Sequence, residues 1–172
     1  MNIRAAVPGD YARLLHIWQH SVLATHAFLS AAEIADLVPV VRDVELPKLE
    51  LWVVCDEQSP VGFTALSGSK IEALFVAPWF FRRGAGRRLL IHARRLAGTR
   101  LTVDVNEQNP GAIAFYESNG FTVIGRSPVD SAGRPFPLLH MIEAEAGGST
   151  QTRGKATTPE AGSSATGLSG RR

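Results

Sequence analysis

The sequence predicts a single α/β domain of the mixed α+β kind, with helices covering both faces of a central mixed sheet of about seven strands. Three observations support this fold class. Apolar residues make up 45% and charged residues 20% of the 172 residues, which is typical of a chain with one globular core. Segments with strand character alternate with segments whose apolar residues recur at helical spacing. Turn-forming residues separate these segments.

The N-terminal part predicts a short strand followed by two helices. The strand, at 3–5, ends at the turn signal of residues 8–10. A second helix is expected to begin at Ser30, because Ser30 and Glu33 have the spacing of a capping box. Pro39 is expected to kink or end that helix, since proline lacks the backbone N–H. The first helix is marked by apolar residues at helical spacing: Tyr11, Leu14, Leu15, Trp18 and Val22.

The middle of the chain predicts an antiparallel meander and then a helix. Three strand-like segments, at 51–55, 61–66 and 71–76, are separated by short turns. The helix is expected to open at Gly84 and to end at Gly98.

The C-terminal part predicts a strand, a helix and a final strand pair. The strand covers 101–105, and the helix begins at Asn109 as a cap and ends at Gly120. Residues 121–125 and 138–142 form the pair. The predicted order is βααβββαβαββ, with about four helices in a domain of residues 1–145.

Residues 146–172 differ in composition from the rest and are expected to be a disordered, basic tail rich in Gly, Ser and Thr. Four basic residues stand against one acidic residue there, a net charge of +3. The whole chain has a net charge of +2, from 18 basic and 16 acidic residues, so 14 basic and 15 acidic residues remain in 1–145. The predicted domain therefore has a net charge of −1, which argues against a nucleic-acid partner.

Several classes of protein are excluded at this stage. No apolar run approaches the roughly 20 residues that cross a bilayer. The first twenty residues lack the apolar stretch of a secretory signal. Cys55 is the single cysteine, so neither an internal disulfide nor a cysteine-based metal site is expected. These observations favour a cytoplasmic protein without a metal.

A glycine turn between a strand and a helix predicts an anion site. The segment 82–88 reads Arg-Arg-Gly-Ala-Gly-Arg-Arg. Its glycines allow a ligand to approach the backbone, and the N–H groups at a helix start bind anions. It is not a Walker loop, because arginines stand where Lys and Ser or Thr are needed. It is not a dinucleotide fingerprint, because Leu89 occupies the place of the third small residue.

A second motif follows at 109–121, with the sequence Asn-Pro-Gly-Ala-Ile-Ala-Phe-Tyr-Glu-Ser-Asn-Gly-Phe. Together and in this order, the two motifs resemble the signature of the GNAT acetyltransferases, a phosphate loop Arg/Gln-x-x-Gly-x-Gly/Ala followed by an Asn…Ala…Phe-Tyr…Gly-Phe helix. The resemblance covers nearly all of residues 2–143. One departure is Phe81, which occupies the position where the family usually has Arg or Gln.

The resemblance implies an acyltransferase that uses acetyl-CoA as the acetyl donor and needs no metal. The pantetheine arm would lie along 74–76 like an added strand, and a backbone N–H there would polarise the thioester carbonyl. Asn109 would bind pantetheine, cap its helix, or do both. The arginines would neutralise phosphate charge, with Arg88 as a further contributor. The cofactor-binding residues that the resemblance implies are Leu74, Phe75, Val76, Arg82, Arg83, Gly84, Ala85, Gly86, Arg87 and Asn109.

The resemblance also implies that Tyr116 is the general acid that protonates the thiolate of CoA. For the base, strand alternation is expected to place Glu72 on the same face as Leu74 and Val76, near the thioester. Asp104 and Glu107, at the end of the neighbouring strand, remain alternatives, as does a water relay.

The acceptor is expected to be a primary amine, acetylated by direct attack in a ternary complex. Candidate acceptor-binding residues are His26, Phe28 and Glu107. Segments 105–109 and 125–127 are similar to small bacterial members described as peptidyl-lysine acetyltransferases, which favours protein lysines. Small amines such as polyamines and aminoglycosides remain open, as does a catalytically weak CoA-binding or regulatory module. The sequence is compatible with a monomer or a homodimer, and it predicts neither a nucleic-acid nor a membrane partner.

Overall fold

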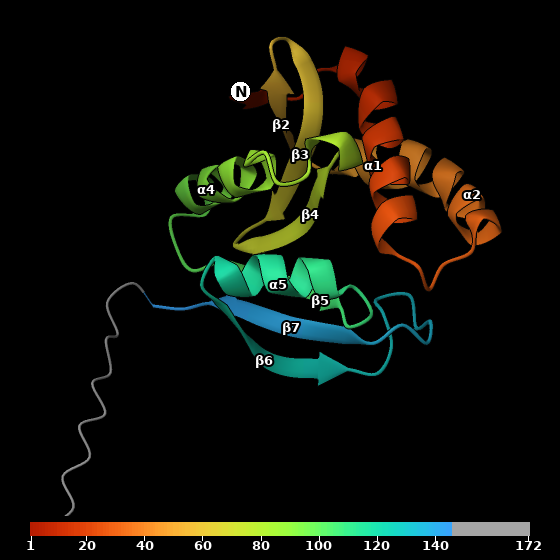
Figure 1. The fold of residues 1–172 in the computed structure, drawn as a ribbon, viewed down its shortest axis with the longest axis vertical. Coiled ribbons are helices and arrows are strands. Elements are labelled where there is room, and N and C mark those ends of the chain that lie inside the picture. Colours follow the sequence, from red (N-terminus) through yellow and green to blue (C-terminus); the bar gives the residue numbers. More distant parts are fainter. Residues whose placement is uncertain (146–172) are drawn as a thin grey trace, which may run out of the picture.

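The computed structural model describes residues 1–145. They form one seven-stranded sheet with the strand order β1-β2-β3-β4-β5-β7-β6 (Figure 1). All strand pairs are antiparallel except β4 with β5, so the sheet is mixed, as the sequence predicts. The expected disordered tail, 146–172, lies outside the described residues.

The predicted strands and helices are present in the predicted order. The strands are β1 (Asn2–Ala5), β2 (Leu51–Asp56), β3 (Ser59–Ser67), β4 (Lys70–Val76), β5 (Thr102–Asn106), β6 (Phe121–Ser127) and β7 (Leu138–Glu143). The main helices are α1 (Tyr11–Thr25), α2 (Ala31–Val40), α4 (Ala85–Ala97) and α5 (Pro110–Ser118). A further short turn, α3 (Leu46–Lys48), precedes β2.

The start of α2 follows the prediction, whereas its end does not. The Ser30 hydroxyl accepts a hydrogen bond from the Glu33 N–H at 3.2 Å, and the Glu33 carboxylate accepts one from the Ser30 N–H at 2.8 Å. α-Helical pairing ends at Val40, next to Pro39, but the chain continues through a π-helical turn at Val41–Glu45 into α3. Pro39 lacks the N–H that would bond to the carbonyl of Ala35, and the π-helical turn begins two residues after it.

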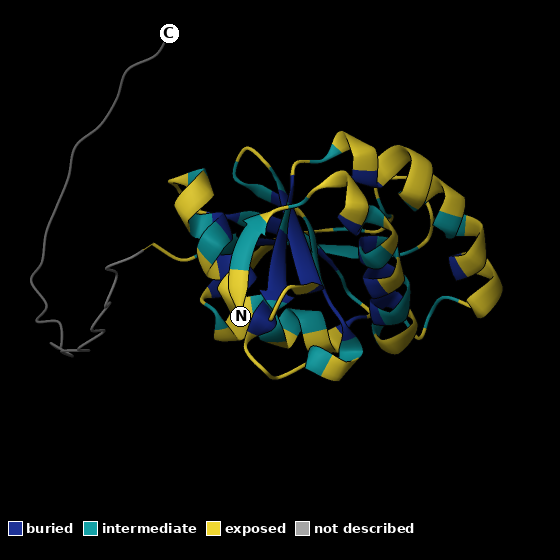
Figure 2. Cartoon of the chain, turned by 90° about the horizontal axis from the view of Figure 1, so that it is seen from above, coloured by how far each residue is buried: buried dark blue, intermediate teal, exposed yellow. Residues whose placement is uncertain are grey.

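The helices cover the two faces of the sheet unequally. α1 and α2 pack on one face of β2, β3 and β4 through a core cluster that includes Ile17, Ile34 and Phe63. α4 packs on the other face of the same strands, and α5 packs on β5 and β6. Figure 2 shows the buried residues gathered in the sheet and on the inward faces of the helices. No helix of the described residues is long and apolar enough to cross a membrane.

The sheet separates in its middle, where β4 meets β5. These strands pair only at two positions, Lys70 with Thr102 and Ile71 with Val103. Beyond Ile71 the edge of β4 that faces β5 has no strand partner among residues 1–145, although β3 stays paired with β4 up to Val76. This separation opens the space in which the site lies.

A bulge in β4 corrects the expectation for Glu72. Ala73 pairs with Ala65 and Ile71 pairs with Leu66, so Glu72 has no partner in β3. The extra residue shifts the period-two alternation. Ile71, rather than Glu72, therefore shares a core cluster with Leu74.

Candidate active site

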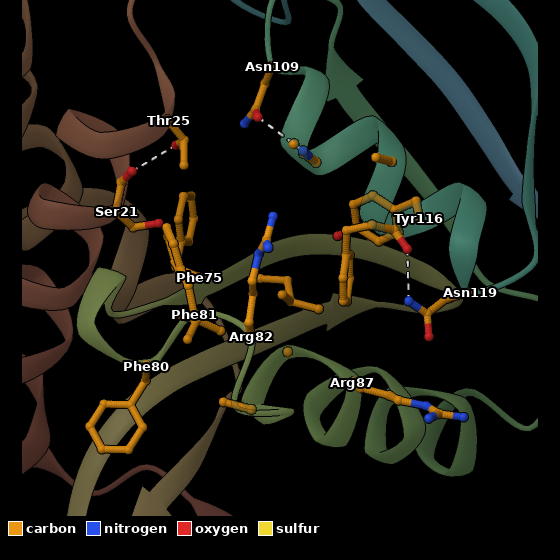
Figure 3. Close-up of a pocket in the computed structure, with 18 of the residues that line it drawn as sticks. Ser21, Thr25, Phe75, Phe80, Phe81, Arg82, Arg87, Asn109, Tyr116 and Asn119 are labelled. Atoms are coloured by element: carbon orange, nitrogen blue, oxygen red, sulfur yellow. Dashed lines mark hydrogen bonds between the residues drawn. The ribbon is translucent and has the colours of Figure 1, made fainter.

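Two adjoining cavities lie where β4 and β5 separate. The larger has a volume of about 690 Å³ and extends from the start of α4 to α5 (Figure 3). The smaller, of about 130 Å³, lies between β4, β5 and α5. The residues that line both cavities are His26, Leu74, Phe75, Asn109, Ala112 and Tyr116.

The glycine turn forms one end of the larger cavity. Gly84 caps α4 with a φ of 82°, a left-handed conformation that favours glycine. A Cβ at Gly86 would stand 3.3 Å from the ring of Phe115, tighter than an ordinary contact, so glycine favours this close approach of α4 and α5. The first N–H groups of α4 have no intrahelical acceptor, so they are available to bind an anion.

The arginines around this turn differ in their position relative to the larger cavity. Arg82 and Arg87 line the larger cavity, and Figure 3 shows the Arg82 guanidinium pointing into it. Arg83 does not line either cavity; its guanidinium lies 5.1 Å from the ring centroid of Phe80. The geometry therefore does not support the expected contact of Arg83 with the cofactor. Phe81 does line the larger cavity, in the place where the GNAT signature has Arg or Gln.

Asn109 caps α5 as predicted. Its side-chain oxygen accepts a hydrogen bond from the Ala112 N–H at 3.1 Å. The residue is buried and lines both cavities (Figure 3). Capping occupies the oxygen, so the amide N–H₂ group is the part that remains to bind a ligand.

Tyr116 lies where the two cavities meet. It is only 6% exposed, and its ring packs against Phe115 and Phe121 at centroid distances of 5.1 and 5.2 Å. Burial raises the pKa of Tyr116 well above its usual range. The hydroxyl is therefore neutral at physiological pH and can act as a hydrogen-bond donor.

The smaller cavity has two carboxylates in its wall, those of Glu72 and Asp104. Asp104 accepts hydrogen bonds from His140 Nδ1 at 2.6 Å and from Lys70 Nζ at 2.9 Å. Burial opposes ionisation of Asp104, but these bonds outweigh it and lower its pKa. Asp104 is thus an anion in the wall of this cavity. The bulge at Glu72, rather than the predicted alternation, places the second carboxylate beside it.

The three candidate acceptor-binding residues have different surroundings. His26 lines both cavities, its Nδ1 lies 2.8 Å from the hydroxyl of Thr25, and burial lowers its pKa, which favours the neutral ring. Phe28 does not line a cavity; it packs on His26 and on Phe136, with centroid distances of 5.2 and 5.3 Å. Phe28 thereby joins the loop after α1 to the loop between β6 and β7.

Glu107 is not part of either cavity. Both of its carboxylate oxygens accept hydrogen bonds from Arg126, each at 2.8 Å. Its proximity in sequence to Asp104 suggested a role at the site, but the residue lies beyond the end of β5 and its charge is already paired.

Sequence reasoning missed other parts of the site. Ser21 and Thr25, on the last turns of α1, line the larger cavity. His140 and Ser127 connect to Asp104 across three strands, and the Ser127 Oγ lies 2.7 Å from His140 Nε2. No sequence motif marks His140 and Ser127, because only the strand register brings them close to Asp104. Within residues 1–145, no group of three or more His, Cys, Asp or Glu side chains could hold a metal ion.

Comparison with known proteins gives consistent results. A family model described as "Acetyltransferase (GNAT) domain" matches residues 47–123. The peptidyl-lysine N-acetyltransferase YjaB of Salmonella typhimurium is 47% identical over 143 residues, covering 83% of this chain and 97% of that protein. The solution structure of apo YjaB from Escherichia coli is 44% identical, with a TM-score of 0.78, and covers 84% of this chain and 98% of that one. PaiA N-acetyltransferase of Thermoplasma acidophilum, solved with coenzyme A, shares the fold at 18% identity, with a TM-score of 0.70 and coverage of 84% and 98%.

Proposed function

The chain belongs to the GNAT acetyltransferases, and on this basis we propose that it transfers the acetyl group of acetyl-CoA to the side-chain amine of a protein lysine. The observation that carries the proposal is the continuous cavity of about 690 Å³, which connects an anion site at α4 with the buried Tyr116. The similarity to peptidyl-lysine N-acetyltransferases supports lysine as the acceptor. The reaction needs acetyl-CoA, which favours the cytoplasm as its compartment.

The cavity suits the two chemical parts of the donor. The diphosphate would lie at the N–H groups of α4, with Arg82 and Arg87 supplying positive charge. The pantetheine amides would pair with the edge of β4 at 74–76, which has no strand partner on the side of β5. Asn109 contributes its amide N–H₂ group to the same region.

The reaction is acyl transfer without a covalent enzyme intermediate. The neutral amine attacks the thioester carbonyl and the C–N bond forms. The nitrogen then loses its second proton to solvent while the C–S bond breaks to release CoA thiolate. A backbone N–H of β4 stabilises the developing oxyanion. The Tyr116 hydroxyl donates a hydrogen bond to the departing sulfur, since a neutral donor lowers the cost of the developing charge.

The acceptor arrives as an ammonium ion with a pKa of about 10.4 and must lose one proton before it attacks. Glu72 is the proposed base, because it lines the smaller cavity and is partly exposed, so the proton can pass from it to solvent. Two carboxylates, those of Glu72 and Asp104, stand against one neighbouring ammonium, that of Lys70, and the remaining negative charge favours cationic acceptors. His26 lines the same cavity, and Phe28 packs against His26 from outside it.

The smaller cavity favours a slender acceptor. At about 130 Å³ it has less than a fifth of the volume of the larger one, at about 690 Å³, which suits the end of an unbranched alkylamine better than a bulky ring.

A screen for release of CoA tests the proposal. Wild-type protein and acetyl-CoA are incubated with lysine peptides, N-terminal amine peptides, polyamines and aminoglycosides, and the free thiol is measured. We expect the highest kcat/KM with lysine peptides and an acetyl group on the lysine side chain by mass spectrometry. Faster turnover of an aminoglycoside would overturn the assignment of the acceptor. No turnover with any amine would contradict the enzymatic function and favour the CoA-binding module.

A further inference from the structure

Lys70 does not itself line the smaller cavity, but its ammonium group contacts both carboxylates that do. Its Nζ lies 2.9 Å from Asp104 Oδ2 and 4.0 Å from Glu72 Oε2, and both carboxylates line the cavity. The ammonium group of Lys70 thus contacts the same Asp104 oxygen to which the ammonium group of an acceptor would bind. The chemistry of the two cations is the same, so they compete for one anion.

The two carboxylate oxygens of Asp104 have partners that differ in how firmly they are held. Oδ1 is bonded to His140 Nδ1 at 2.6 Å, and the other ring nitrogen of His140 is bonded to Ser127 at 2.7 Å. These three residues stand on the adjacent strands β5, β7 and β6, and Asp104 pairs directly with His140 in the sheet register. The carboxylate is therefore held by the sheet itself.

The Lys70 side chain is held more loosely. It is 43% exposed, against 29% for that of Asp104, and it carries its charge on four flexible methylene groups. When a second cation approaches Oδ2, the lysine can withdraw to solvent, whereas the carboxylate stays in place.

We propose that Lys70 competes with the acceptor ammonium for Asp104 Oδ2, so that Lys70 sets the affinity of the enzyme for cationic acceptors. This inference rests on the proposed function, because it assumes that an amine enters the smaller cavity. The expected size follows from the exposure of the pair: an ion pair of this kind reduces the affinity of a competitor by about two- to fivefold.

Binding, rather than turnover, gives the decisive test. Protein saturated with CoA is titrated calorimetrically with a lysine peptide, for the wild type, Lys70→Met, Asp104→Asn and the double variant. We expect Lys70→Met to lower the Kd about two- to fivefold and Asp104→Asn to raise it. In the Asp104→Asn background, Lys70→Met should have a smaller effect, because the remaining carboxylate contact of Lys70 is the longer one to Glu72, at 4.0 Å.

Two controls separate this effect from general changes in charge or fold. Lys48→Met removes an exposed lysine on α3, outside both cavities, and should leave the Kd unchanged. A peptide with norleucine in place of lysine carries no ammonium, and its binding should not respond to Lys70→Met. Thermal unfolding of each variant establishes that it is folded.

An unchanged or higher Kd in Lys70→Met would overturn the inference, as would equal effects of this substitution in both backgrounds. Failure of wild-type protein to bind the peptide would overturn it too. Failure of the proposed function is a different result, because it is seen as absence of acetyl transfer in the CoA-release screen. The titration contains no acetyl donor and does not depend on that outcome.

Discussion

Replacement of Tyr116 by phenylalanine removes one oxygen from the centre of the site and little else. The ring contacts with Phe115 and Phe121, at centroid distances of 5.1 and 5.2 Å, remain possible for a phenyl group. We therefore expect the free energy of unfolding to change by no more than about 1 kcal/mol. We expect the substitution to lower kcat instead.

The structure suggests the size of the loss. General acids contribute about 100- to 10,000-fold. Burial raises the pKa of Tyr116 above its usual range, whereas a thiol has a pKa of about 8.5, so complete transfer of the proton to the thiolate is uphill. The hydroxyl then acts through a hydrogen bond in the transition state. We expect a loss at the lower end, about 100-fold in kcat, which corresponds to about 2.7 kcal/mol.

The assay follows CoA release at saturating lysine peptide, with the Kd of acetyl-CoA from calorimetry on the same preparations. The Kd should stay within about twofold of wild type, because the lost interaction belongs to the transition state. Tyr11→Phe, which removes the other tyrosine hydroxyl of the chain, should retain full activity. A kcat for Tyr116→Phe within about threefold of wild type would refute the role of the hydroxyl as proton donor.

Three further predictions concern the cofactor and the fold. Gly86→Leu should abolish CoA binding in calorimetry, because a Cβ there already stands 3.3 Å from an aromatic ring of α5. Arg87→Ala should weaken CoA binding about tenfold, whereas Arg83→Ala, outside the cavity, should leave it unchanged. Asp10→Asn should lower the free energy of unfolding in urea at pH 7 by about 1 to 3 kcal/mol, because the buried carboxylate is paired with Arg4 at 2.6 Å. The pKa of Asp10 is lowered in the folded state, chiefly by this bond, so its stabilisation is present above the unfolded value of about 3.9 and is lost as the pH falls through the folded one.

Each of these predictions has a control and an outcome that contradicts it. Gly9→Ala adds a methyl group where nothing lies within 4 Å and should bind CoA normally. Tight CoA binding by Gly86→Leu would mean that the turn does not form the anion site. Equal effects of the two arginine substitutions would contradict the separate positions of these side chains. A stability difference for Asp10→Asn that persists undiminished at pH 2 would show that charge is not its cause.

Local sequence signals were sufficient for most of the secondary structure. These signals are the capping box at Ser30 and Glu33, the Asn109 cap, and the glycines at the two ends of α4. Each acts within one helical turn, so the interacting residues are neighbours in the sequence. The two motifs also indicated the family. The path of the chain after α2 was harder to predict, because Pro39 indicates a break in α-helical pairing but no local signal marks the π-helical turn at Val41–Glu45 that follows.

The tertiary structure decided how the site is built. The two-position pairing of β4 with β5 creates the cavities, and the bulge at Glu72 shifts the alternation on which the sequence prediction relied. Asp104 and Glu107 lie three residues apart, yet one lines the smaller cavity while the other pairs with Arg126. Strand register sets these outcomes, and it depends on contacts between residues far apart in the chain. Sequence alone therefore predicted the elements and indicated the family, while only the assembled sheet determined which charged groups meet in the smaller cavity.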